Sequence, residues 1–510
     1  MKKIHTKEQL RLFAIAVGSV VASSVAGAIG LNDLNIQQIL TAQNSGETSC
    51  VQIAKMSIAA RRSHQELHAF ISDNDQLLTQ AIELDEKRKS GEMLPLHCVP
   101  FAIKDNIDVA GLPTTGGSVL LTKNYPKRDA TVVERLRAKG ALVVGKTNLD
   151  ELAIAGSTIS SLGGQTLNPY DKSRFAAGSS GGSAVAVATG MAVCALGTET
   201  VNSLRNAASS SGVVAMRTSH GLVSRDGAIS VAPSMDVIGP MCKTVADVTA
   251  VLSVIVGRDY RDPETVGVES LREPLTSETA GVYSLKGKRL GILTNLFGNA
   301  PEHQETNQVI SAAVQKLKAA GVEFVEVSDP EFDTETMSSR LNVSNYEFRP
   351  QFEAYLAGRT SRNSVASVAQ YAAAKKYPET MKGFMANAVA WRNPTSMPRY
   401  IESLRAADKL KEKISNLMTK EQLVALVYPA QKRPPILVQD KPRPERNGIF
   451  ASALGLPAID LNAGFTPPTA SAPRGLPIGM DLLGEIYGDP ELLRLAQAVE
   501  KSLALRTNGD

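Results

Sequence analysis

The run GSSGGS at positions 178–183 leads directly into AVAVATGMAV at 184–193, a stretch of small apolar residues that predicts a helix. A Gly/Ser loop at a helix N-terminus presents several backbone N–H groups, so it can hold an anion or an oxyanion. The alternative is a flexible linker, but linkers seldom lead into so apolar a helix. A P-loop is excluded, because no Gly-Lys-Ser/Thr follows.

The same run formally matches the G-x-S-x-G nucleophile elbow, with Ser180 at its centre. That motif needs a strand immediately before it, whereas NPYDKSR at 168–174 cannot form a central strand. Only His220 and His303 lie downstream as bases for a triad. The context therefore excludes the elbow.

Strands and helices alternate on both sides of this loop. The predicted strands are 95–103, 141–145, 289–294 and 322–327, and the predicted helices lie within 34–71 and at 130–139, 149–155, 184–193 and 306–320. Residues 338–420 are polar and helical in pattern and predict an insertion, and 430–447, rich in Pro, Lys and Arg, predict a surface loop. The alternation predicts an α/β fold.

Two further positions are candidates for chemistry. Lys104 ends the apolar strand 95–103, and a lysine held neutral by burial can serve as a general base. Ser203 lies in GTETVNSLR at 197–205, where Glu199 and Arg205 can pair around it. Taken alone, Lys104 is also explained as a solvated lysine, and Ser203 as an ordinary loop serine.

Together these segments resemble the amidase signature family of serine hydrolases, whose pattern is Lys, then Gly-Ser-Ser-Gly-Gly-Ser, then Gly-Thr-Glu/Asp-Thr-x-x-Ser-Ile/Leu-Arg. Lys104 precedes Ser179 by 75 residues, and Ser179 precedes Ser203 by 24, spacings that fit the family. Further matches are GKTNLDE at 145–151, NPY at 168–170, SMDVIGPM at 234–241, GLPA at 455–458 and GLPIGMDLLG at 475–484. The resemblance covers about 32–502 and implies the amidase signature fold, a large mixed twisted β-sheet flanked by helices on both faces.

The resemblance implies a Ser–cis-Ser–Lys triad. Ser203 is the expected nucleophile, Ser179 the proton relay after a cis peptide bond, and Lys104 the neutral base. The expected oxyanion hole consists of the backbone N–H groups of residues 200–203, those of Thr200, Val201, Asn202 and Ser203 itself. Ser180 is expected to support this network by hydrogen bonding.

Three positions depart from the family pattern. Val201 and Asn202 replace the usual Gly-Gly before the nucleophile, and glycine permits backbone angles that a β-branched valine does not. We expect a reshaped acyl pocket there. Ala177 replaces the first Gly of Gly-Gly-Ser-Ser, a mild change, and Glu199 keeps the carboxylate that can brace Arg205.

The N-terminus has the pattern of a secretory signal peptide at 1–28. Four basic residues precede an uncharged stretch at 12–30, which contains the small-residue site Ala26-Gly27-Ala28. We expect a periplasmic or secreted protein, with a membrane anchor at 12–30 as the alternative. Residues 1–28 carry +3 of the formal net charge of +4, so the remainder is nearly neutral and the charge gives no indication of nucleic-acid binding.

The four cysteines, Cys50, Cys98, Cys194 and Cys242, form no CxxC pattern or Cys/His cluster. This spacing argues against a zinc site and against a dense disulfide framework, and Cys194 is expected as a small buried residue on the helix 184–193. The histidines show no HxH or HExxH spacing. We expect no metal and no cofactor.

The functional expectation is an amidase, closest to the peptide-amidase-like branch of the family, which converts a carboxamide to an acid and ammonia or an amine through an acyl-enzyme. Its expected partner is a small-molecule amide substrate, and its expected state is a monomer or homodimer, without membrane insertion after cleavage of the leader. The resemblance implies a substrate pocket partly lined by the insertion 338–420, within an amidase domain spanning 29–510. Two alternatives remain: the glutaminase-type subunit of a tRNA-dependent amidotransferase, and a non-catalytic amidase-fold binding protein.

Overall fold

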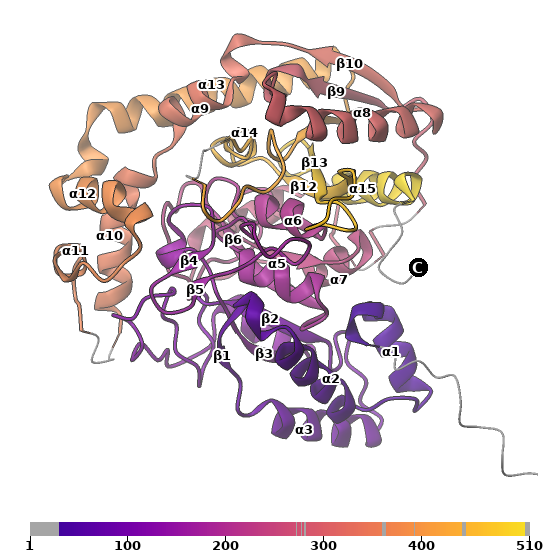
Figure 1. The fold of residues 1–510 in the computed structure, drawn as a ribbon, viewed down its shortest axis with the longest axis vertical. Helices are drawn as coiled ribbons and strands as arrows, with labels where there is room; N and C mark the ends of the chain where they lie inside the picture. The colour runs from indigo at the N-terminus through magenta and orange to yellow at the C-terminus, as the bar shows by residue number, and fades with distance from the viewer. Residues whose placement is uncertain are drawn as a thin grey trace, which may run out of the picture.

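A computed structural model describes residues 30–504, apart from 272, 277, 280–281, 360–363, 392 and 441–444. The described strands form one sheet in the order β1-β3-β2-β6-β8-β7-β12-β13-β11-β9-β10, beside a small β4-β5 hairpin (Figure 1). The sheet strands are β1 (Phe70–Asp73), β2 (Pro100–Lys104), β3 (Leu142–Thr147), β6 (Cys194–Glu199), β7 (Val214–Arg217), β8 (Val237–Cys242), β9 (Arg289–Leu293), β10 (Glu323–Val327), β11 (Ala425–Pro429), β12 (Ala458–Phe465) and β13 (Pro477–Leu483). The hairpin strands are β4 (Ile159–Ser160) and β5 (Gly164–Gln165).

The sheet is mixed and is covered by helices on both faces. Strand β2 runs parallel to β3 and β6, whereas β6 pairs antiparallel with β8. Every residue of β2, β3, β6, β8 and β13 is buried, as expected of strands packed on both faces. The large mixed α/β fold expected from the sequence is confirmed.

The helices that cover the sheet come from segments along the whole chain. Helix α5 packs on β6 and β2, α6 packs on β13, and α7, α8 and α15 pack together against the sheet. These and the other helices outside the arm are α1 (Ile36–Asn44), α2 (Cys50–Ser63), α3 (Leu77–Lys89), α4 (Thr131–Ala138), α5 (Gly181–Ala188), α6 (Arg205–Ser211), α7 (Val245–Ile255), α8 (Gln304–Ala319), α14 (Ile449–Ser452) and α15 (Asp489–Leu503).

Three predicted helices differ from the structure. The segment 34–71 is two helices, α1 and α2, followed by strand β1. The predicted helix 149–155 is only a 3-10 turn at Glu151–Ala153, because Leu152 lies at φ 53° and Ala153 at φ 60°. The helix predicted at 184–193 begins earlier, at Gly181, and ends at Ala188, with Gly190 at φ 69° beyond it.

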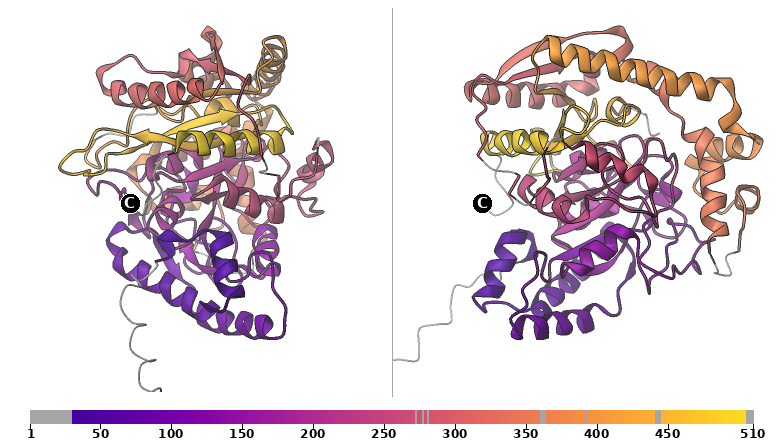
Figure 2. Two further views of the ribbon diagram at one scale, coloured as in Figure 1. Left: turned by 90° about the vertical axis from the view of Figure 1, so that its right-hand side faces the viewer. Right: turned by 180° about the vertical axis from the view of Figure 1, so that it is seen from behind.

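The described residues of the segment 334–420 form a helical arm, drawn in salmon and orange, across the top and down one side of the molecule (Figure 2). It consists of α9 (Thr334–Leu341), α10 (Ser344–Ala357), α11 (Val368–Ala374), α12 (Lys382–Ala390) and α13 (Pro398–Lys420). Its aromatic side chains pack mainly on one another: the Tyr346 ring lies 5.0 Å from Trp391 and 5.6 Å from Tyr400. Tyr346 is buried in this cluster, and Trp391 and Tyr400 pack against it.

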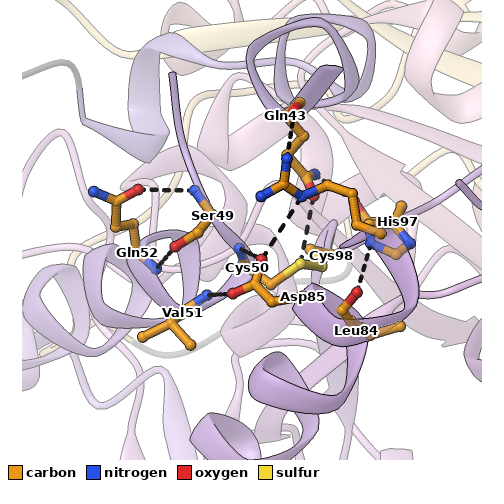
Figure 3. Close-up of a disulfide and its surroundings, with 10 residues drawn as sticks. Gln43, Ser49, Cys50, Val51, Gln52, Leu84, Asp85, His97 and Cys98 are labelled. Carbon is orange, nitrogen blue, oxygen red and sulfur yellow. Dashed lines mark hydrogen bonds and ion pairs between the residues drawn. A yellow bond between two sulfur atoms is a disulfide. The ribbon is translucent and has the colours of Figure 1, made fainter. Parts of the chain in front are cut away.

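All four cysteines are paired, which corrects the expectation for Cys194. Cys50 at the start of α2 bonds Cys98, and Cys194 bonds Cys242 across the antiparallel strands β6 and β8. Cys194 therefore lies on a strand, not on a helix. Figure 3 shows the Cys50–Cys98 bridge, where Asp85 accepts the backbone N–H groups of Cys50 and Val51. The pairing was missed because each partner is 48 residues away and only the fold brings the two together.

The predicted leader and the alternative anchor at 12–30 lie outside the described residues, except for Gly30. Within the part of the chain that the structure describes, no helix combines the length and the apolar character needed to cross a membrane.

Candidate active site

Lys104, at the end of β2, is fully buried and lies among hydroxyl groups. Its Nζ lies within hydrogen-bond distance, 2.8 Å, of each of three hydroxyl oxygens, Ser179 Oγ, Ser180 Oγ and Thr198 Oγ1. Burial lowers the pKa of Lys104 to about 7, although the charges of nearby carboxylates oppose this shift. A large fraction of this amine is therefore neutral near pH 7 and has a lone pair that can accept a proton.

The loop before α5 places two serines against this amine. The Gly178–Ser179 peptide bond is cis, which confirms the expectation. Asp150 N–H donates to the Ser179 carbonyl at 3.2 Å, and a Cβ at residue 178 would lie 2.4 Å from Asp150 Oδ2. Only glycine fits at 178, because the loop passes so close to Asp150.

Ser203 lies in the turn between β6 and α6 and is 6% exposed. The Ser180 N–H donates to the Ser203 carbonyl at 3.1 Å, so Ser180 contacts both the lysine and the loop that carries Ser203. Among the described residues, none forms a hydrogen bond with Ser203 Oγ. Ser203 lines a cavity of about 220 Å³, where its hydroxyl is available to a bound ligand.

The backbone before Ser203 is arranged as a set of free donors. The N–H groups of residues 200–203 donate to no described acceptor, and all four residues line the same cavity. Asp236 Oδ1 accepts the Thr200 hydroxyl at 2.6 Å, which holds the first of these residues in place. Consecutive free N–H groups beside a cavity can hold an oxyanion, so these four donors are available for the predicted role.

Glu199 and Arg205 pair around Ser203, as the sequence suggests. Arg205 Nη2 lies 2.8 Å from Glu199 Oε1, and both side chains are buried. Glu199 Oε2 also accepts the backbone N–H groups of Leu204 and Arg205, at 3.1 and 3.2 Å. Arg205 forms a second ion pair with Asp481 on β13. This network fixes the turn that presents Ser203.

The residues that replace Gly-Gly adopt ordinary backbone angles, since neither Val201 nor Asn202 has a positive φ. Room for the Asn202 side chain comes from Gly448, where a Cβ would lie 1.8 Å from Asn202 Cβ. The Asn202 side-chain amide is buried and has no hydrogen-bond partner among the described residues. A glycine at this position would lack this buried amide.

The replacement at 177 is less mild than expected. Ala177 lies at φ 57°, in the left-handed region that glycine adopts readily. A left-handed conformation costs an alanine about 1–2 kcal/mol. The surrounding contacts must hold this loop in place against that cost.

A second cavity, of about 330 Å³, adjoins the one at Ser203. Ala155 and Arg446 line both. The helical arm contributes Ser338, Asn342, Ser344, Asn345 and Phe384 to the Ser203 cavity. The arm therefore forms part of the wall of the Ser203 cavity.

The sequence motifs contained supporting residues whose roles were not foreseen. Asp150 in GKTNLDE contacts the Ser179 loop, Asp236 in SMDVIGPM holds Thr200, and Asp481 in the C-terminal motif pairs with Arg205. Arg446 was missed altogether, because it lies in a stretch whose composition indicates only a surface loop. The signal for the three aspartates was their place inside ordered motifs.

Comparisons with known proteins agree with this geometry. The profile of the family described as Amidase matches residues 53–493. A glutamyl-tRNA(Gln) amidotransferase subunit from Deinococcus radiodurans is 32% identical, over 91% of this chain and 96% of that protein.

Solved structures of similar fold include the native peptide amidase of Stenotrophomonas maltophilia, with TM-score 0.82, 31% identity and coverage of 94% of this chain and 98% of that one. A glutamyl-tRNA(Gln) amidotransferase subunit from Thermotoga maritima gives TM-score 0.72 and 26% identity, covering 93% and 95% of the two chains. Together with the profile match, these similarities show that the chain belongs to the amidase family and is an amide-hydrolysing enzyme.

Proposed function

We propose that this amidase is an exported, free-standing enzyme that hydrolyses the C-terminal carboxamide of peptides to a carboxylate and ammonia. The observation that carries the chemistry is Lys104, a buried amine with a pKa lowered to about 7, whose Nζ lies 2.8 Å from Ser179 Oγ. A neutral amine in that position is a general base for a serine relay.

In the first half-reaction, Ser203 Oγ attacks the carboxamide carbon while its proton moves to Ser179, whose own proton moves to Lys104 Nζ. The carbonyl oxygen becomes an oxyanion, which the N–H groups of residues 200–203 stabilise; loss of one such donor typically costs about 3–4 kcal/mol. The proton returns through Ser179 to the leaving nitrogen. The C–N bond breaks, ammonia leaves, and an acyl-Ser203 ester remains.

In the second half-reaction, water attacks the ester carbonyl and gives its proton to the same Ser179–Lys104 pair. The tetrahedral intermediate collapses, the C–O bond to Ser203 breaks, and the proton returns to Ser203 Oγ. The products are a carboxylic acid and the free enzyme, with Lys104 neutral again.

The substrate class is supported by the similar structures and by two polar side chains at the site. The similar structure from Stenotrophomonas is a peptide amidase, and a structure of a peptide amidase in complex with the competitive inhibitor chymostatin also matches, with TM-score 0.81. In this chain, the side-chain amide of Asn202 has no hydrogen-bond partner among the described residues. The same is true of Asn345 Oδ1. Both residues line the Ser203 cavity and can hydrogen-bond a peptide backbone.

Export is supported by the leader pattern at 1–28 and by the two disulfides, since disulfides persist mainly in oxidising compartments. We propose a periplasmic or secreted location, with a membrane anchor at 12–30 as the alternative. The proposed state is a monomer or homodimer.

A second candidate is the glutaminase-type subunit of a tRNA-dependent amidotransferase, favoured by the Deinococcus relative, which has about the same identity to this chain as the peptide amidase. The lower TM-score of the Thermotoga protein and the disulfides favour the first proposal. A non-catalytic binding protein is disfavoured by the lowered pKa of Lys104.

The test is ammonia release by the purified protein, without any partner, from a panel of peptide amides, simple alkyl and aryl amides, and glutamine. We expect peptide amides to have the highest kcat/KM and Ser203→Ala to abolish turnover. Activity confined to glutamine, or appearing only when amidotransferase partners are added, would support the second candidate instead.

A further inference from the structure

Arg446 is the one charged residue that lines the Ser203 cavity, among the described residues. Its side chain is half-buried, and it also forms part of the wall of the neighbouring 330 Å³ cavity. A ligand that extends from Ser203 into the second cavity must therefore pass this guanidinium. Its place at the junction suggests a role in selecting substrates.

Arg446 forms no direct ion pair with a described carboxylate. Its Nη1 donates to the Ala155 carbonyl at 3.1 Å, and the buried Asp150 attracts its charge only from beyond ion-pair distance. A guanidinium has five N–H donors, so several remain for a ligand. The other charged residues of the second cavity, Arg433 and Glu445, pair with each other, and Glu445 also meets His303 at 3.1 Å. Among the described residues that line the two cavities, Arg446 is therefore the charged one without a direct ion-pair partner.

Neighbouring residues hold the guanidinium at this junction. A Cβ at Gly156 would lie 1.8 Å from Arg446 Nη1, so the absence of a side chain there makes room for it. The backbone of Arg446 forms a bridge with Gln431, which also lines the second cavity. The guanidinium is thus positioned by backbone contacts and not by a direct ion pair, which leaves N–H donors for an anionic group of a ligand.

We propose that Arg446 binds a carboxylate on the acyl part of the substrate, so that the enzyme favours peptide amides with an acidic side chain next to, or at, the amidated residue. This inference rests on the proposed function and names its preferred substrates. A carboxylate fits the planar guanidinium through two parallel hydrogen bonds. Neutral amides still reach Ser203 but lack this contact.

The test uses two series of peptides, Ac-Xaa-Leu-NH₂ and Ac-Leu-Xaa-NH₂, in which Xaa is Glu, Gln or Lys. In at least one series we expect kcat/KM for Glu to exceed that for Gln by about tenfold or more, as for a hydrogen bond to a charged group. Arg446→Met should abolish that preference while Gln peptides are still hydrolysed, and Arg446→Glu should shift the preference to Lys. Arg62→Met, which removes an exposed arginine of α2 that lines neither cavity, is the matched control and should change nothing.

Binding separates this inference from the proposed function. The same peptides are titrated into Ser203→Ala and Ser203→Ala/Arg446→Met by calorimetry, which needs no turnover. Tighter binding of Glu peptides that depends on Arg446, without hydrolysis by the wild type, would refute the proposed function and keep the inference. Equal kcat/KM and equal affinity for Glu and Gln in both series, or a preference that survives Arg446→Met, would overturn the inference.

Discussion

Lys104→Met is expected to lower kcat for amide hydrolysis by about a thousandfold and to leave the protein folded. Methionine fills a similar volume but has no lone pair that can take the proton of Ser179. Lys243→Met is the matched control, because burial also lowers the pKa of Lys243, to about 8, while its Nζ donates only to Asn32 in the described structure. Steady-state ammonia release with both variants measures the difference. A Lys104→Met enzyme within tenfold of the wild type would exclude Lys104 as the base.

The same lysine determines the expected pH dependence. Below pH 7 the amine is increasingly protonated and cannot act as a base, so kcat/KM falls by about tenfold per pH unit below that value and is level just above it.

The lowered pKa of Lys104 also makes the free energy of unfolding depend on pH. The folded-state pKa of about 7 lies below the ordinary value of 10.5, so the unfolded chain binds more protons between these pH values. The free energy of unfolding attributable to Lys104 therefore rises with pH across this window. In Lys104→Met that rise is absent, so the variant gains stability relative to the wild type as pH falls from 10 to 7.

Arg205→Met is expected to lower the free energy of unfolding by about 3–5 kcal/mol, because it leaves buried carboxylates without their counter-charge. Arg205 is 1% exposed and bonds Glu199, Asp481 and the Gly448 carbonyl. Lysine is a poor substitute, since it cannot reproduce the fork that reaches these partners at once. Equilibrium denaturation in urea, followed by circular dichroism, measures the loss.

The control for Arg205 is Arg128→Met. Arg128 also contacts an aspartate through two nitrogens, at 2.6 and 2.8 Å from Asp226, but its side chain is 47% exposed. Pairs of that kind contribute about 0–1 kcal/mol, so a small change is expected. Equal losses in the two variants would show that burial of the Glu199–Arg205–Asp481 network adds nothing to its strength.

The segments around Lys104, Ser179 and Ser203 were predictable because their order and spacing are specific, and the strands near them are continuous apolar runs. The 3-10 turn at 151–153 was not predictable, because the spacing of its apolar residues resembles that of a helix. Its backbone conformation goes with a hydrogen bond from Leu152 N–H to the Gly116 carbonyl. Local pattern carries no information about a partner 36 residues away in the chain.

The two disulfides and the position of Arg446 between the two cavities could not be predicted from the sequence for a related reason. Cys194 and Cys242 face each other only because β6 and β8 pair antiparallel, which no local pattern predicts. Arg446 stands in a stretch whose composition indicates only a surface loop, and its place becomes apparent only when Gly156 and Ala155 are brought beside it. Compensation between Asn202 and Gly448 is likewise a property of the fold.

The central claim is that Ser203 is the nucleophile. The most direct measurement is fluorophosphonate labelling followed by mass spectrometry of the proteolysed enzyme, with the wild type, Ser203→Ala, Ser179→Ala and Lys104→Met compared at pH 8. We expect one adduct, on the peptide that contains Ser203, formed quickly in the wild type, slowly in the Ser179 and Lys104 variants, and not at all in Ser203→Ala. An adduct that persists in Ser203→Ala, or that maps to another serine in the wild type, would contradict that claim.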